Sequence, residues 1–216
     1  MFLSGDRDYL SRRSISVLLA VSVLTNVLLL GKIYSARVIQ SVVIATQSPP
    51  VAVASDHVRG NPGAPVTIIV YMDYQCPFCA RLNASMVTLL KTVNARWIYR
   101  DFPLDAHPFA ETAAETAECA GAQGKFWQYS DALFDPQNDV TGDSSFTVIG
   151  AKLGLDTRAL TECVASQRFQ RRVAAQQQDG VRRRITGTPT FFVNGRRFDG
   201  LIPLDQLKKE IESAGG

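Results

Sequence analysis

Apolar residues near the start of the chain form one uninterrupted run. Residues 14–31 (SISVLLAVSVLTNVLLLG) contain no charged side chain, and Arg12, Arg13 and Lys32 flank them. A helix that crosses a bilayer needs about 20 apolar residues, with a working range near 17–25. Because this run is apolar on every face and precedes a linker, it predicts a transmembrane or signal helix, and a buried core helix is the less favoured interpretation.

The residues after this run bear on how the chain is exported. A cleaved signal peptide ends in a small-x-small site, whereas the bulky Tyr34 occupies the first small position in residues 32–36. An uncleaved anchor is therefore favoured over cleavage followed by secretion. The basic residues before the run indicate that residues 1–37 form a cytoplasmic stub and membrane anchor. The remainder is expected outside the cytoplasm, in the periplasm or an equivalent extracytoplasmic space.

Apolar periodicity next predicts a strand–helix–strand unit. Residues 38–62 are interpreted as a linker, because proline and glycine cluster there. Residues 66–72 (VTIIVYM) form a short β-branched apolar run that is typical of a buried strand. Apolar residues recur at helical spacing between positions 82 and 93, and residues 96–102 (RWIYRDF) form the next strand. These elements predict a parallel, right-handed βαβ unit.

The rest of the pattern is a block of helices followed by a hairpin and a last helix. Asn194-Gly195 separates two short predicted strands, residues 190–193 and 196–198, which is a strong hairpin signal. An amphipathic helix is predicted after the hairpin, at residues 204–211. The helical block before it comprises predicted helices at residues 110–122, 125–134, 145–153, 157–166 and 167–184.

The net charge of the chain lies in its N-terminal segment. The formal net charge is +3, but residues 1–37 carry five basic and two acidic side chains, which leaves eighteen of each sign in residues 38–216. A neutral domain offers no general electrostatic attraction for nucleic acid. The arginine run 182–184 is interpreted as a solvated helix face, and nucleic acid is not an expected partner.

Cys76 and Cys79 are the candidate reactive centre. They lie at the junction of a predicted strand and helix, and Pro77 suits the first helical turn. Unpaired backbone N–H groups and the helix dipole at that end favour a Cys76 thiolate, which is the form that attacks disulfides. Cys79 lies one turn further, where it can resolve a mixed disulfide. Because Phe78 has neither charge nor donor, we expect a smaller depression of the Cys76 pKa than histidine would give there.

Three other interpretations of the Cys-x-x-Cys motif compete with this one. It could be half of a zinc site, but the remaining candidate ligands, His57, His107, Cys119 and Cys163, are scattered and form no second pair. It could also be a structural disulfide or two buried unreactive thiols. The strand–motif–helix context favours the redox centre, and neither metal nor cofactor is expected.

Four runs of sequence resemble the DsbA-like branch of the thioredoxin superfamily: residues 64–67, 73–79, 123–127 and 187–195. The similarity extends over about residues 56–214. The resemblance implies an α/β thioredoxin fold (βαβ…ββα) with an inserted all-helical subdomain. The core would comprise residues 63–104 and 186–216, and the insertion residues 105–185.

The resemblance also implies roles for individual residues. Cys76 would be the nucleophile, Cys79 the resolving cysteine and Pro189 a cis-proline that faces them. A cis bond would expose the backbone of Thr188 to an incoming extended peptide. Pro77 and Phe78 would contact the same substrate. An ordinary trans-proline loop is the alternative reading of residues 187–190.

The chain departs from the family pattern at the position of a buried acid. Thioredoxin and DsbA carry this acid six residues before the first cysteine, where this chain has Val70. Asp73 is a second candidate proton acceptor for Cys79, and a turn residue at the end of the strand is the favoured interpretation of it. Both this departure and the missing inter-cysteine histidine bear on the oxidising power of the pair.

Cys119 and Cys163 lie on two different predicted helices of the insertion. In an oxidising compartment an even pair predicts a structural disulfide. The alternatives are free buried thiols or a relay pair that exchanges electrons with Cys76 and Cys79. A bond between them would contribute about 3–4 kcal/mol in the chain-entropy model.

The leading functional hypothesis is oxidation of reduced exported polypeptides, with a membrane partner that re-oxidises the enzyme. A disulfide isomerase or reductase is the first alternative. The second is a non-catalytic peptide-binding assembly factor of the cell envelope, which would hold clients beside Pro189.

Overall fold

The computed structural model describes residues 17, 22–35, 48–138 and 140–216. It divides into two units, residues 1–47 and residues 48–216. In the first unit, residues 22–35 are helical and exposed. Within the described part of the chain, no helix combines the length and apolarity that a membrane crossing requires. The predicted span at 14–31 lies partly outside the described residues, so the membrane anchor stays a prediction.

The second unit is built on a mixed five-stranded sheet, as the α/β prediction requires, with strand order β1-β3-β2-β4-β5. β2 and β3 pair in parallel and the other neighbours are antiparallel. Helix α2 (Pro77–Leu89) connects the two parallel strands, and α8 (Leu204–Ser213) closes the chain. The strands are β1 (His57–Gly60), β2 (Val66–Met72), β3 (Ala95–Asp101), β4 (Thr190–Val193) and β5 (Arg196–Asp199).

Strand β1 corrects the predicted linker, because it falls inside residues 38–62. It pairs with β3 at the edge of the sheet, with His57 opposite Tyr99. Its alternating sequence of half-buried and exposed residues is too short and polar to stand out from the surrounding proline and glycine. Side-chain contacts hold it: the Trp127 indole N–H donates to the Val58 carbonyl at 3.1 Å. The Arg59 guanidinium lies 4.2 Å from the centre of a Trp127 ring.

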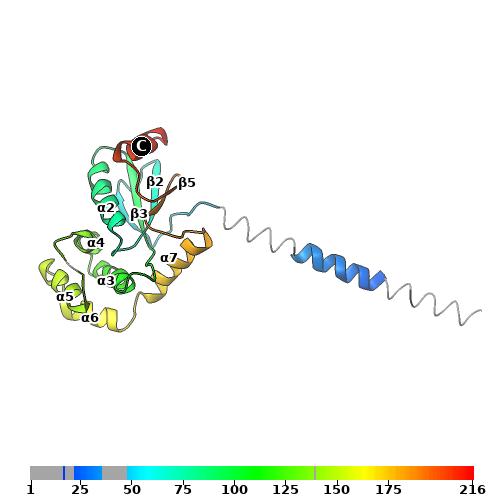
Figure 1. Cartoon of the computed structure of the whole chain (residues 1–216), viewed down its shortest axis with the longest axis horizontal. Coiled ribbons are helices and arrows are strands. Elements are labelled where there is room, and N and C mark those ends of the chain that lie inside the picture. The colour runs from blue at the N-terminus through cyan, green and yellow to red at the C-terminus, as the bar shows by residue number, and fades with distance from the viewer. Residues whose placement is uncertain (1–16, 18–21, 36–47, 139) are drawn as a thin grey trace, which may run out of the picture. The chain divides into compact units, whose positions relative to one another are not determined.

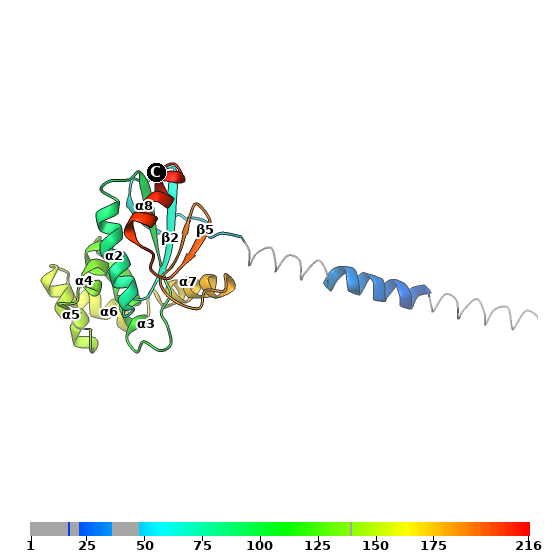
Figure 2. The same cartoon turned by 45° about the horizontal axis from the view of Figure 1, so that its top comes forward.

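The two faces of the sheet bury different side chains, because successive residues of a strand point to opposite sides. Val66, Ile68, Val70 and Met72 of β2 face the larger core, which α2, α8 and the helical block cover (Figure 2). Ile69 and Tyr71 face a smaller cluster together with Ile98, Phe102, Ile185 and Phe192.

Residues 48–56 also pack against the sheet unit, although they belong to the predicted linker. Arg100 of β3 anchors them: its guanidinium donates to the Val51 carbonyl at 2.8 Å and pairs with Asp56 at 2.9 Å. Both side chains of this pair are nearly inaccessible, with exposed fractions of 8% and 2%. The folded unit therefore begins earlier than the predicted boundary.

The helical insertion follows the predicted periodicity, and α3 to α6 gather at one end of the sheet (Figure 1). The largest difference is the start of α7, which is at Gln170 rather than residue 167. Gln167 has φ 53°, a left-handed conformation that cannot continue the preceding helix. The helices are α3 (Ala110–Ala122), α4 (Phe126–Phe134), α5 (Asp143–Lys152), α6 (Thr157–Ala165) and α7 (Gln170–Arg182).

Candidate active site

The cysteine motif lies where β2 ends and α2 begins. Cys76 is the N-cap residue of α2, with extended backbone, and Pro77 occupies the first turn. Asp73 shapes the connection: its carboxylate accepts from the Gln75 N–H at 2.7 Å and its carbonyl accepts from the Cys76 N–H at 3.1 Å. Cys76 is therefore held at the helix end whose backbone N–H groups are unpaired.

Cys76 and Cys79 are both free thiols in this structure. Their side chains are buried, with exposed fractions of 5% and 0%. The peptide bond between Thr188 and Pro189 is cis. The Cys76 sulfur lies 3.2 Å from the Thr188 carbonyl oxygen, so the loop before β4 lies directly against the start of α2. The fold thus brings together two motifs that are 112 residues apart.

The pKa values of the two thiols are shifted in opposite directions. The pKa of Cys76 is lowered from 9.0 to about 5, with the hydrogen bond from the Cys79 thiol as the largest cause. Thr188 and the backbone N–H groups of Cys79 and Phe78 lower it further, while burial opposes them. The pKa of Cys79 is raised, because burial disfavours its thiolate and the Cys76 hydrogen bond adds to this. One sulfur is therefore ionised at neutral pH and the other is a thiol.

This difference predicts selective alkylation of the reduced protein. Iodoacetamide will modify Cys76 with a half-maximal rate near pH 5, because the thiolate is the reacting form. Mass spectrometry of the product will locate the label, and Cys79 will react only after unfolding. A midpoint near the ordinary value of 9.0 would contradict the ionised Cys76.

Phe78 and Pro77 lie on the exposed side of the motif. Phe78 is 48% exposed, and the Arg81 guanidinium stands 4.7 Å from its ring centre. Beside them a groove of about 570 Å³ runs from Cys76 to the end of α4. Its lining includes Leu133, Phe134, Pro136, Arg81 and Val140. This groove could not be predicted from the sequence, because its walls come from segments that meet only in the folded chain.

The Asp73 carboxylate makes its contacts with the loops around the cysteine motif. Besides the Gln75 N–H, its carboxylate accepts from the Leu104 N–H at 2.8 Å and lies 2.8 Å from His107 Nδ1. The side chain is 1% exposed. These contacts favour the turn-residue interpretation over a role as proton acceptor for Cys79.

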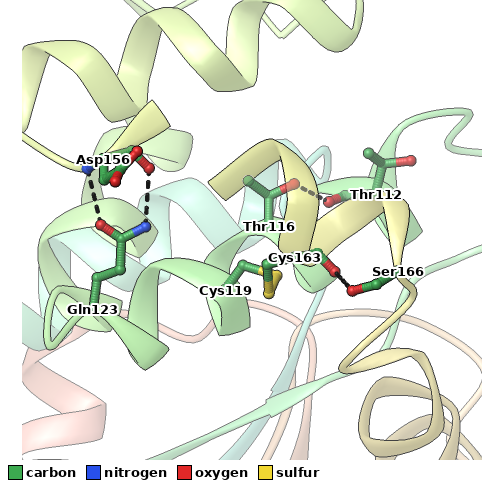
Figure 3. The surroundings of a disulfide bond; sticks show 7 residues. All are labelled: Thr112, Thr116, Cys119, Gln123, Asp156, Cys163 and Ser166. Atoms are coloured by element: carbon green, nitrogen blue, oxygen red, sulfur yellow. Dashed lines mark hydrogen bonds between the residues drawn. A yellow bond between two sulfur atoms is a disulfide. The ribbon is translucent and has the colours of Figure 1, made fainter. Parts of the chain in front are cut away.

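Cys119 of α3 and Cys163 of α6 form a disulfide, with an S–S distance of 2.06 Å and Cα atoms 5.9 Å apart (Figure 3). A second link joins the same region, since the Gln123 side chain exchanges two hydrogen bonds with the backbone of Asp156.

His57 is paired with Glu118. The four scattered candidate zinc ligands are therefore engaged in other contacts.

A thiol pair at a helix start, opposite a cis-proline and on a mixed sheet, defines the thioredoxin-like thiol–disulfide oxidoreductases. A family model described as thioredoxin matches residues 53–213, and the chain belongs to that family. The predicted resemblance is thereby confirmed.

Solved structures agree with this class. A thioredoxin-like oxidoreductase from Silicibacter pomeroyi is 27% identical, with a TM-score of 0.68, and the match covers 76% of this chain and 94% of that one. Wolbachia pipientis alpha-DsbA1 is 20% identical, with a TM-score of 0.67 and coverage of 76% and 94%. Bacillus subtilis BdbD is 21% identical, with a TM-score of 0.68 and coverage of 77% and 96%. The Wolbachia and Bacillus proteins show that this chain shares their fold.

Curated relatives match over only part of their own length. The chain is 38% identical over 167 residues to Na(+)/H(+) antiporter NhaA 1 of Salinispora arenicola, covering 76% of this chain and 26% of the relative. It is 33% identical over 172 residues to NhaA 1 of Mycolicibacterium gilvum, covering 77% and 28%. The chain thus spans about a quarter of the length of these relatives.

Proposed function

We propose that the chain forms disulfides in exported polypeptides, with Cys76 as the nucleophile and Cys79 as the resolving cysteine. The observation that carries this proposal is the opposite acidity of the two neighbouring thiols. A stabilised Cys76 thiolate favours the reduced form of the pair, which makes its disulfide a stronger oxidant. The low pKa of Cys76 also makes its thiolate a good leaving group when the client disulfide forms.

The reaction starts from the Cys76–Cys79 disulfide. A client thiolate attacks the Cys76 sulfur, the S–S bond breaks, and Cys79 leaves with its electron pair. A second client thiolate then attacks the client sulfur of the mixed disulfide, and Cys76 leaves as the thiolate. The client has lost two electrons and two protons to the enzyme. A membrane redox partner takes the electrons and restores the Cys76–Cys79 disulfide.

The backbone beside Pro189 is the proposed docking edge for the client. The Thr188 carbonyl lies 3.2 Å from the Cys76 sulfur, so an extended peptide that pairs with Thr188 would present its own cysteine to Cys76. Pro77 and Phe78 form the exposed margin of the same site. Recognition through backbone hydrogen bonds would suit clients of varied sequence, because these bonds do not depend on the client's side chains.

The same thiol pair would serve an isomerase or reductase if its disulfide were less oxidising. A peptide-binding assembly factor would use the docking edge without the thiols. The catalytic unit is proposed to lie outside the cytoplasm, tethered by the N-terminal segment. Transport is not proposed, because the antiporter relatives are matched over about a quarter of their length.

Equilibration of the full-length chain with glutathione tests the proposal and separates these alternatives. We expect a reduction potential between about −180 and −120 mV, the range from protein disulfide isomerase to DsbA. A value near the −270 mV of thioredoxin would indicate a reductase. Client binding that persists unchanged in a Cys76→Ser/Cys79→Ser variant, without any client oxidation by the wild type, would favour the assembly factor.

A further inference from the structure

The groove beside the cysteine motif carries a positive charge on one wall. That wall is the start of α2, and it is lined by Cys76, Pro77, Ala80 and Arg81. The Arg81 guanidinium stands 4.7 Å from the ring centre of Phe78, which is 48% exposed. A guanidinium that stacks on an aromatic ring keeps the N–H donors along its edge free for other partners.

Arg81 forms neither a hydrogen bond nor an ion pair with any residue that the structure describes; its contact is the stacking on Phe78. Other arginines of the folded unit are engaged, since Arg59 and Arg172 each pair with a carboxylate at 2.7 Å. A solvated arginine would have this appearance anywhere on the surface. What distinguishes Arg81 is that it lines the same groove as the Cys76 sulfur.

The opposite wall of this groove is mostly apolar. It is formed by the end of α4 and the loop that follows, with the side chains of Leu133, Phe134, Pro136 and Val140. Asp135 also belongs to this wall, but its carboxylate accepts from the Gln137 N–H at 2.9 Å and so closes its own turn. The groove thus offers an apolar side and the unpaired donors of Arg81 to whatever enters it.

Cys76 lies between this groove and a second hollow. Its sulfur is 3.2 Å from the carbonyl oxygen of Thr188, which lines a separate hollow of about 250 Å³. The arginine of that hollow is occupied: Arg197 pairs with Asp199 at 2.7 Å and donates to the carbonyls of Arg183 and Arg184. A client bonded to the Cys76 sulfur therefore meets free positive charge on the groove side of its cysteine.

We propose that Arg81 selects clients that carry an aspartate or glutamate on one side of the reacting cysteine, an inference that rests on the proposed thiol–disulfide exchange. The client backbone on the other side pairs with Thr188. The reach is suitable, because the helix rises about 7.5 Å from residue 76 to residue 81. Two or three residues of extended client chain span about 7–10 Å, which brings a carboxylate at that distance to Arg81.

The redox state of the motif makes this selection act at binding. The oxidised enzyme meets the client, and its Cys76–Cys79 disulfide has no charge that would offset the Arg81 guanidinium. Cys76 becomes a thiolate only when the client disulfide has formed. The new negative charge then repels the carboxylate of the bound client, which favours release of the product.

The test measures how fast reduced single-cysteine peptides form a mixed disulfide with the full-length, oxidised chain. The peptides carry glutamate or lysine two residues from the cysteine, on one side or the other, and acid-quenched samples are quantified by mass spectrometry. We expect glutamate to be favoured by about fivefold on one side, the upper end for an exposed ion pair. The ratio should approach one in 1 M salt, where the screening length is about 3 Å.

Charge variants of Arg81 assign this preference. Arg81→Gln will abolish it, Arg81→Glu will invert it, and Arg81→Lys will keep part of it, since lysine retains the charge without the planar fork. Arg158→Gln is the matched control: it removes the same charge from α6, where the Arg158 side chain is 89% exposed, and should keep the wild-type ratio. Circular dichroism verifies that each variant is folded.

Three results would overturn the selection by Arg81: a wild-type ratio near one at low salt, an equal preference on both sides of the cysteine, or a preference that survives Arg81→Gln. An equal loss in Arg158→Gln would also overturn it, because overall charge would then be the cause. Any of these with Cys76-dependent oxidation would leave the proposed function standing. Client oxidation that survives Cys76→Ser would remove both.

Discussion

Cys76→Ser will abolish oxidation of a reduced client, with a loss of at least about a thousandfold, the scale on which removal of a catalytic nucleophile acts. The Cys76 sulfur receives the client in the first step and leaves in the last, and a serine hydroxyl can do neither. The pKa of about 5 means that this sulfur is a thiolate throughout the neutral range. Turnover of a fluorescent dithiol peptide by the full-length chain measures the effect.

Cys79→Ser separates the two roles within the motif. The Cys76 thiolate will still attack a client disulfide in this variant, but no neighbouring thiol remains to release the captured chain. A mixed disulfide with Cys76 will therefore accumulate and will be visible by mass spectrometry. A Cys76→Ser protein that oxidises the client at the wild-type rate would refute the assignment of the nucleophile.

Much of this site could be predicted from the sequence because its elements are locally encoded. The apolar run of β2 and the helical spacing after Cys76 identify a strand that leads into a helix, and Pro77 marks the first turn. The hairpin at Asn194-Gly195 fixes where β4 ends. Each of these features depends on residues that are close in sequence.

The features that could not be predicted depend on distant contacts. Strand β1 has little apolar pattern of its own and gains its place from β3 and Trp127. The acidity of Cys76 depends on Thr188, which approaches only in the folded chain. Asp101 is, in the sequence, an ordinary polar residue at the end of an apolar strand, and only its complete burial in the fold distinguishes it.

The helical insertion contributes to the site through α4. α3 lies beside α4, and the end of α4 supplies Leu133 and Phe134 to the groove next to Cys76. The disulfide joins α3 to α6, so it holds the far side of the same block. The stability of the insertion is therefore coupled to the shape of the surface that a client would meet.

Loss of the Cys119–Cys163 disulfide will lower the free energy of unfolding by about 3–4 kcal/mol, because it closes a loop with a sequence separation of 44. The measurement is best made in a Cys76→Ser/Cys79→Ser background, where the oxidised and reduced forms of one protein differ only in this bond. Denaturant unfolding of the two forms gives the difference directly. A difference below about 1 kcal/mol would contradict a main stabilising role.

The same bond offers a test of the electron-relay alternative. If Cys119 and Cys163 exchanged electrons with the Cys76–Cys79 pair, a Cys119→Ala/Cys163→Ala variant would oxidise the client more slowly. The rate would fall in proportion to the fraction of electrons that pass through Cys119 and Cys163. If the bond is structural, the variant will turn over at the wild-type rate per folded molecule at low temperature and will fail only on heating. We expect the second outcome, because the bond ties α3 to α6 within the helical block, whereas Cys76 and Cys79 are set by the junction of β2 and α2.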